Sequence, residues 1–124
     1  MKLCKNYING EWVDSVSGKT APTYNPATGE FLAEMVVSTP EDVDLAVAAA
    51  RTSFYETRDW RDMDSQTRGD ILLKIADLID KYRDELARIE SMDMGKPLRE
   101  AEGDVDDALH CYRYYAGLIK APHG

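Results

Sequence analysis

The sequence predicts an α+β fold, in which a β-hairpin and a further short strand precede three amphipathic helices. Three observations lead to this prediction. An Asn-Gly dipeptide separates two β-prone runs near the amino terminus, the patterning changes from strand-like to helical near residue 38, and three later segments repeat apolar residues with a helical period. The chain has 124 residues, 44% of them hydrophobic, which is enough for one domain with a modest core.

The amino-terminal part carries the turn chemistry of β-hairpins. Asn9-Gly10 lies inside the run 7–13, and both residues accept the positive φ angles of a type I′ turn. Residues 20–24 favour another short extended segment, which the turn residues of 25–29 close. Residues 31–37 then alternate in the manner of a strand.

Helix signals follow in three segments. Thr39 is a candidate N-cap before Pro40, and apolar residues then recur on one helix face as far as Phe54. The second helix is expected to begin near Asp64 or Ser65 and to run unbroken to Gly95-Lys96-Pro97. The third is expected over about residues 98–118, with an apolar face listed as Val105, Leu109, Tyr112, Ala116 and Ile119.

Charge and cysteine content restrict the partners and the compartment. The net charge of −8 argues against nucleic acid or an anionic membrane as a partner. No run has the length or apolarity of a signal peptide or a membrane span. Cys4 and Cys111 lie far apart and form no Cys-x-x-Cys pair, so we expect a cytoplasmic protein in a reducing compartment.

The common catalytic constellations are missing from the sequence. It contains no Gly-x-Gly-x-x-Gly or Walker loop, so no phosphate cradle can be named. His110 and His123 lack the spacing of metal ligands, and His110 and Cys111 would point about 100° apart on a helix. We therefore expect Cys111 to be a small buried apolar residue and His110 to lie on the helix surface.

Acidic residues in the last two predicted helices are the remaining candidates for a site. Asp104 and Asp107 are three residues apart, which places them on one helix face away from the apolar stripe. The simplest interpretation is a solvated face near the helix start, where acids favour the helix dipole. Asp93 precedes Gly95, where helix geometry ends and carbonyl groups become free to bind a ligand.

Taken together, the segments resemble the amino-terminal part of the aldehyde dehydrogenase superfamily. The resemblance extends over essentially the whole chain, in the order and spacing of the family. Each motif alone is weak and the ordered set is specific. The motifs are Tyr-Ile-Asn-Gly-Glu-Trp-Val (7–13), Asn-Pro-Ala-Thr-Gly-Glu (25–30), residues 41–51, Trp60-Arg61, residues 68–72, Met94-Gly95-Lys96-Pro97 and Arg113-Tyr114-Tyr115-Ala116-Gly117.

The resemblance implies a piece of the α/β aldehyde dehydrogenase fold, with residues 1–124 forming one incomplete coenzyme-binding domain. In the family a cysteine thiolate attacks the aldehyde, hydride passes to NAD(P)⁺ and water releases a carboxylic acid. The nucleophile, the general base and the nicotinamide-binding fold of family members lie beyond the point where this chain stops. We therefore assign no catalytic or cofactor-binding residue, and we expect the chain to be inactive and to bind no NAD(P) alone.

Two lesser sites carry over from the resemblance. Many members hold a structural monovalent cation, K⁺ or Na⁺, and the matching oxygen ligands here are those of Thr23, Tyr24 and Asp93. In betaine-aldehyde and aminoaldehyde members, carboxylates matching Asp104 and Asp107 face the cationic end of the substrate. Those members often place an aromatic residue before the first aspartate, whereas this chain has glycine there.

Three functional hypotheses follow. The chain is the amino-terminal portion of an aldehyde dehydrogenase, or a short non-catalytic protein that acts as a binding module, or a small helical interaction domain whose resemblance is accidental. The ordered motifs favour the first. The many large rings predict leftover apolar surface, to be covered by the remainder of an aldehyde dehydrogenase chain or by self-association. These rings are Tyr7, Trp12, Trp60, Tyr112, Tyr114 and Tyr115.

Overall fold

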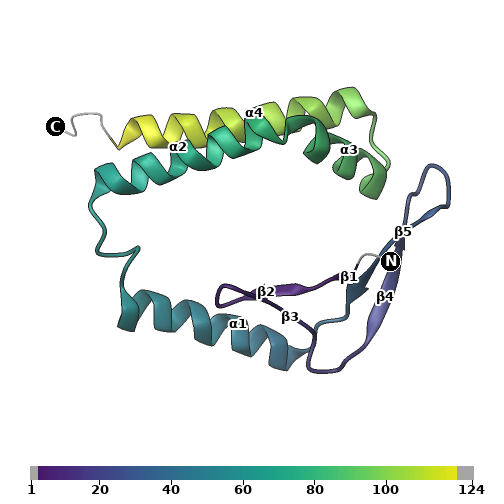
Figure 1. Cartoon of the computed structure of the whole chain (residues 1–124), viewed down its shortest axis with the longest axis horizontal. Helices are drawn as coiled ribbons and strands as arrows, with labels where there is room; N and C mark the ends of the chain where they lie inside the picture. The colour runs from purple at the N-terminus through teal and green to yellow at the C-terminus, as the bar shows by residue number, and fades with distance from the viewer. Residues whose placement is uncertain (1–2, 120–124) are drawn as a thin grey trace. The chain divides into compact units, whose positions relative to one another are not determined.

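A computed structural model describes residues 3–119 of the chain (Figure 1). His123, which lacks metal-ligand spacing to His110, lies outside the described residues. The chain divides into two compact units, one ending at Asp62 and the other beginning at Met63, and each is described by itself. The described helices and strands confirm the predicted α+β composition, with strands in the first unit and helices in both.

The predicted hairpin is present in the first unit. Strands β2 (Asn6–Ile8) and β3 (Glu11–Val13) pair antiparallel, with Tyr7 opposite Trp12. The turn between them has φ angles of 54° at Asn9 and 83° at Gly10. Positive φ at both residues is what a type I′ turn requires, and the Asn-Gly pair supplies it at low steric cost.

A second, three-stranded sheet has the order β1-β5-β4. Strands β4 (Thr20–Tyr24) and β5 (Phe31–Val36) pair antiparallel, which confirms both predicted extended segments, and the register shifts between Thr23 and Tyr24. Strand β1 (Leu3–Cys4) pairs parallel with β5 and was not predicted. A two-residue strand is too short to carry an alternating pattern, so the sequence gives no local signal for it.

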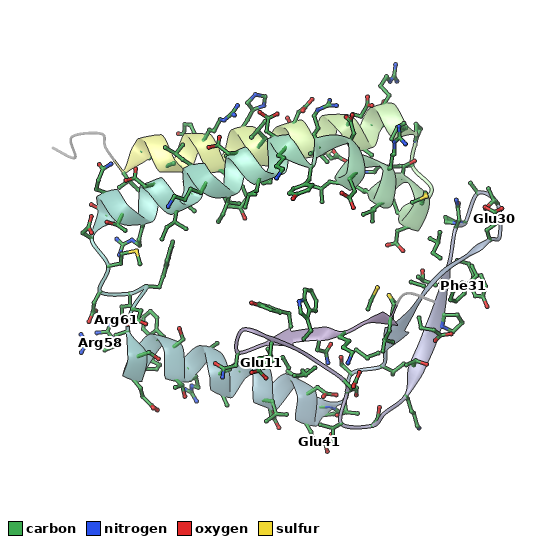
Figure 2. All side chains as sticks on the ribbon, viewed as in Figure 1. Glu11, Glu30, Phe31, Glu41, Arg58 and Arg61 are labelled. Atoms are coloured by element: carbon green, nitrogen blue, oxygen red, sulfur yellow. The ribbon has the colours of Figure 1, made fainter. Side chains whose placement is uncertain are left out.

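Helix α1 (Pro40–Thr52) begins with the predicted cap. The Thr39 side chain accepts a hydrogen bond from the backbone N–H of Asp42, and the Asp42 carboxylate accepts one from the backbone N–H of Thr39. The chain then makes a π-helical turn, η1 (Ser53–Thr57), which ends at Arg58 with φ 64°. Arg58 and Arg61 are labelled at this end of the first unit in Figure 2.

Asp42 also ties α1 to the loop that follows β3. Ser15 Oγ lies 2.7 Å from Asp42 Oδ2, and the backbone N–H of Val16 donates to Asp42 Oδ1 at 2.9 Å. Asp42 is only 3% exposed and Ser15 is 6% exposed. Because a buried carboxylate is costly unless its oxygens accept hydrogen bonds, these donors are what allow the charge to be buried.

The second unit contains helices α2 (Ser65–Lys81), α3 (Arg83–Met94) and α4 (Leu98–Leu118). The prediction of one unbroken helix from residue 64 or 65 to Gly95 was therefore wrong, and residues 3–119 form four α-helices where three were predicted. The chain bends at Tyr82, where φ is −103° and ψ is 15°. Leu86 N still donates to the Tyr82 carbonyl at 2.9 Å, so the departure from helix geometry is confined to this one residue.

Small residues make the core of the second unit. Ala76 of α2, Ala87 of α3 and Ala101 of α4 are all 0% exposed, so the helices approach closely at these positions. Gly69 marks a further close approach, because a Cβ atom there would lie 3.4 Å from the carbonyl oxygen of Ala116. The predicted apolar face of α4 is confirmed in part: Val105, Leu109 and Ala116 are buried together with Ala101, and Ile119 is partly buried. Tyr112 was predicted on this face and is instead 37% exposed.

Much apolar surface stays exposed in each unit. Within residues 3–119, no large side chain is fully buried. Trp12 of the first unit is 69% exposed, and Tyr114 and Tyr115 of the second are 63% and 56% exposed. None of the helices in the described part of the chain is long and apolar enough to cross a membrane.

Candidate functional site

Helix α4 carries the carboxylates that the sequence singles out. It begins after a tight connection, in which Gly95 has φ 78° and Pro97 is the N-cap. Glycine reaches this left-handed conformation easily, and proline closes the entry to the next helix. Within little more than one turn of α4 stand three aspartates, Asp104, Asp106 and Asp107. The three carboxylates have different surroundings.

Asp104 is held by a lysine of the connection. Lys96 Nζ donates to Asp104 Oδ2 and also to Glu90 Oε1, the latter at 2.8 Å. The Lys96 side chain is only 22% exposed, and its carbonyl oxygen accepts a hydrogen bond from Ser91 Oγ at 2.8 Å. The hydrogen bond to Asp104, followed by the one to Glu90, raises the pKa of Lys96. Lys96 is therefore charged and fixed between the end of α3 and the start of α4.

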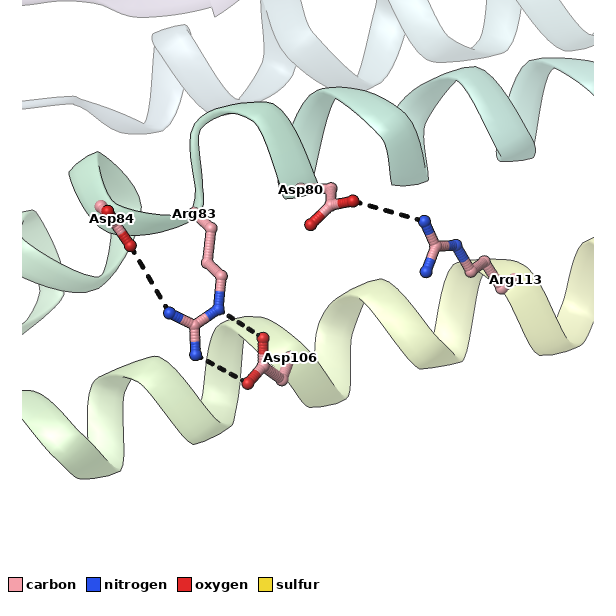
Figure 3. A network of polar contacts seen from close by, with 5 residues as sticks. All are labelled: Asp80, Arg83, Asp84, Asp106 and Arg113. Carbon is pink, nitrogen blue, oxygen red and sulfur yellow. Dashed lines mark hydrogen bonds and ion pairs between the residues drawn. The ribbon is translucent and has the colours of Figure 1, made fainter.

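Asp106 belongs to a second ion-pair network (Figure 3). Arg83, the first residue of α3, donates a hydrogen bond to each carboxylate oxygen of Asp106, from Nε to Oδ1 at 2.6 Å and from Nη2 to Oδ2 at 2.8 Å. This hydrogen-bonded pair lowers the pKa of Asp106 and raises that of Arg83. The same guanidinium lies 3.5 Å from Asp84, and Arg113 of α4 lies 3.6 Å from Asp80. The ion pair between Asp106 and Arg83 thus connects α4 to α3, and it occupies both carboxylate oxygens of Asp106.

Asp107 is the exception on this helix. It is exposed, and its carboxylate has no hydrogen-bond or ion-pair partner among residues 3–119. The structure thus confirms that Asp104 and Asp107 lie on one helix away from the buried stripe, but it gives them different surroundings. Of the three aspartates, Asp107 is the one whose carboxylate has no partner in the described part of the chain.

Two neighbouring residues of α4, His110 and Cys111, are both exposed. His110 is exposed, as expected. Cys111 is exposed as well, so the expectation that it is a buried apolar residue was wrong. The buried stripe of α4 passes through Leu109 and Ala116, and position 111 lies off that stripe. Cysteine is often buried in proteins, but the position of Cys111 around the helix determines its exposure in this chain.

The predicted cation ligands divide between the two units. Thr23 and Tyr24 lie at the end of β4, where its register with β5 shifts. Asp93 lies in the last turn of α3, two residues before Gly95, and is exposed. Backbone and carboxylate oxygens suit a hard cation, so the residue types fit such an ion. The cation site itself stays a prediction from the resemblance.

Sequence reasoning did not single out Lys96 or Arg83 as partners of the α4 carboxylates. For Lys96 a signal existed, because it is eight residues from Asp104 across a tight Gly-Lys-Pro connection. For Arg83 no sequence signal existed, because its pairing with Asp106 depends on the bend at Tyr82, and no glycine or proline marks that bend in the sequence.

The chain is similar to known proteins over nearly its whole length. Residues 12–124 match the model of the aldehyde dehydrogenase family. The mitochondrial aldehyde dehydrogenase of Homo sapiens is 47% identical over 119 residues, which is 95% of this chain and 23% of that protein. Retinal dehydrogenase 2 of Homo sapiens is 43% identical over 125 residues, covering 100% of this chain and 24% of the relative.

Solved structures agree in fold. A betaine aldehyde dehydrogenase from Staphylococcus aureus, in complex with NAD⁺, matches with a TM-score of 0.90 and 39% identity over 95% of this chain and 24% of that one. An aldehyde dehydrogenase from Bacillus cereus matches with a TM-score of 0.88 and 42% identity over 99% and 26%. The chain therefore spans about a quarter of the length of the relatives it matches, at their amino-terminal side.

Proposed function

Because the chain belongs to the aldehyde dehydrogenase family, we propose that residues 1–124 act as the amino-terminal portion of an NAD(P)-dependent aldehyde dehydrogenase, which oxidises an aldehyde to a carboxylic acid. The observation that carries this proposal is the family match over residues 12–124, together with 47% identity to a relative across 95% of the chain. The proposal assigns no catalytic or NAD(P)-binding residue to this chain. Those roles fall to the part of an intact family member that the match does not include.

The role of this segment is to build part of the coenzyme-binding domain and to cover its neighbour. Support comes from the exposed apolar side chains of both units, which suit contact with another protein surface. The natural partner of that surface is the remainder of an aldehyde dehydrogenase chain. Without it, we propose that the chain associates with itself, and that it works in the cytoplasm with its two cysteines reduced.

For the substrate, we propose an aldehyde with a cationic end, of the betaine-aldehyde or aminoaldehyde class. The support is the carboxylate of Asp107, which is exposed and uncommitted, beside that of Asp104 on the same helix. Carboxylates at this position would attract an ammonium or trimethylammonium group once the rest of the protein excludes water around them. Gly103 offers no ring for a cation–π contact, so the attraction would be electrostatic alone.

A structural monovalent cation is the last part of the proposal. Its ligands would be the oxygens of Thr23 and Tyr24 and the carboxylate of Asp93. Such an ion would tighten the structure without taking part in the reaction.

A chimera tests the proposed function. Residues 1–124 replace the corresponding amino-terminal quarter of the Staphylococcus aureus betaine aldehyde dehydrogenase, to which they are 39% identical. NADH formation is followed by its absorbance with an aldehyde and NAD⁺. We expect the chimera to turn over, and we expect neither the chain alone nor the truncated S. aureus protein alone to do so.

The two other outcomes are equally informative. Turnover by the purified 124-residue chain would contradict the absence of catalytic residues. A folded, inactive chimera, together with stable binding of the free chain to an intact aldehyde dehydrogenase, would favour the non-catalytic binding module instead.

A further inference from the structure

We propose that Lys96 determines how strongly the α4 face attracts a cation, by occupying Asp104 and leaving Asp107 as the main carboxylate for the charged end of a substrate. This inference rests on the proposed function, in which α4 faces the aldehyde. It assigns to Lys96 the role of a positioning residue that acts through Asp104. Of the two predicted carboxylates, Asp107 then binds the cation and Asp104 is held by Lys96.

The geometry of Lys96 carries the first step. Its ammonium group contacts carboxylates on both sides of the α3–α4 connection, Glu90 of α3 and Asp104 of α4. Its side chain is 22% exposed and that of Glu90 is 34% exposed, so the pairing is partly shielded from water. A direct hydrogen bond from an ammonium group occupies a carboxylate oxygen, whereas mobile ions in solution only screen its charge. Asp104 is therefore turned toward the connection.

The charge balance gives the second step. Lys96, Glu90 and Asp104 together carry one net negative charge, where the two carboxylates without Lys96 would carry two. Asp106 adds almost nothing, because Arg83 neutralises it through two hydrogen bonds. Of the three aspartates, only Asp107 has no hydrogen-bond or ion-pair partner for either carboxylate oxygen within residues 3–119. A cation arriving at this face meets its strongest attraction at Asp107.

The test compares two aldehydes of the same shape. Betaine aldehyde carries a trimethylammonium group, and 3,3-dimethylbutanal has a neutral carbon in place of the nitrogen. The ratio of their kcat/KM values in the chimera isolates the charge preference from effects on folding or on the reaction itself. We expect Asp107→Asn to lower this ratio about tenfold, and Asp104→Asn to lower it by less.

Lys96 variants then decide the inference. Lys96→Met frees Asp104 and should raise the ratio about threefold, whereas Lys96→Arg keeps the charge and should leave it near its starting value. Adding Asp104→Asn to Lys96→Met should cancel the rise. An unchanged ratio in Lys96→Met, or an equal fall in activity toward both aldehydes, would overturn the inference and reduce Lys96 to a structural residue.

The outcomes for the two proposals are separable. Failure of the unsubstituted chimera to oxidise either aldehyde counts against the proposed function. If the chimera oxidises the neutral aldehyde but Lys96→Met does not change the ratio of the two kcat/KM values, only the role proposed for Lys96 is contradicted. The pairing can also be measured in the 124-residue chain itself, where thermal unfolding of Lys96→Met, Asp104→Asn and the double variant should give a non-zero coupling. Additive effects would show that the two residues do not interact and would overturn the inference.

Discussion

Among single residues, Asp42 is notable for a buried carboxylate that accepts hydrogen bonds at both oxygens. Its carboxylate accepts from Ser15, from the backbone of Thr39 and from the backbone of Val16, and these hydrogen bonds lower its pKa from 3.8 to about 2. We predict that Asp42→Asn lowers the melting temperature at pH 7 by roughly 5–10 °C, because an amide cannot accept from all of these donors. Thermal unfolding followed by circular dichroism measures the shift.

The pH dependence of this effect has a defined sign. A carboxylate with a pKa below its ordinary value stabilises the folded state above about pH 4, and this stabilisation is lost as pH falls from 3.8 toward about 2. The gap between the melting temperatures of the wild type and Asp42→Asn should therefore shrink over that range. Asp44→Asn, an exposed position on the same helix, is the control and should stay within about 2 °C of wild type. A gap that is constant with pH would refute the assignment.

Sequence reasoning reached one half of this arrangement. The N-cap role of Thr39 and the place of Pro40 at the first helical position were predicted, because capping depends on residues only a few positions apart. The link from Asp42 to Ser15 spans 27 residues and needs the fold of the loop after β3. Asp106 shows the same limit in the candidate site, because its partner Arg83 is 23 residues away and reaches it only through the bend at Tyr82.

At the scale of elements, the helices of the second unit are governed by small residues at their contacts. Ala87 and Ala101 are both 0% exposed and belong to one cluster with Val105. We predict that Ala101→Leu destabilises the second unit by about 2 kcal/mol, because added methylene groups must separate α3 from α4. Urea unfolding gives the free energy.

An exposed alanine on the same helix provides the control. Ala108→Leu makes the same chemical change where the side chain faces outward, and it should alter stability by less than about 0.5 kcal/mol. Equal effects of the two substitutions would mean that the close approach of α3 and α4 is not what holds the unit together.

This close approach also explains the helix that was predicted as one and found as two. The apolar stripe continues through Tyr82 without glycine or proline, so local propensity favours continuation. Only the bend lets α3 bury Ala87 against α4 and lets Arg83 reach Asp106. The hairpin, by contrast, was predictable because its turn chemistry is local to Asn9-Gly10.

For the molecule as a whole, the decisive property is apolar surface without a covering partner. On the second unit, α2 and α3 leave three large apolar side chains exposed, with Leu78 at 53%, Leu86 at 40% and Ile89 at 43%. These residues line one shallow groove together with Ile75, Ile79, Tyr82 and Glu85. An apolar groove of this kind favours association when no other surface covers it. We therefore predict that the free chain forms dimers or larger species as its concentration rises.

Size-exclusion chromatography with light scattering measures the mass across a dilution series. Leu78→Lys combined with Leu86→Lys should shift the chain toward the monomer, because charged side chains in the groove oppose its burial. The control is Val43→Lys combined with Val47→Lys, at positions 56% and 51% exposed on α1 of the first unit. If the control pair dissociates the chain equally well, the groove of the second unit is not the contact. If the chain stays monomeric at every concentration, the prediction of self-association is wrong, and the exposed apolar surface remains in contact with water.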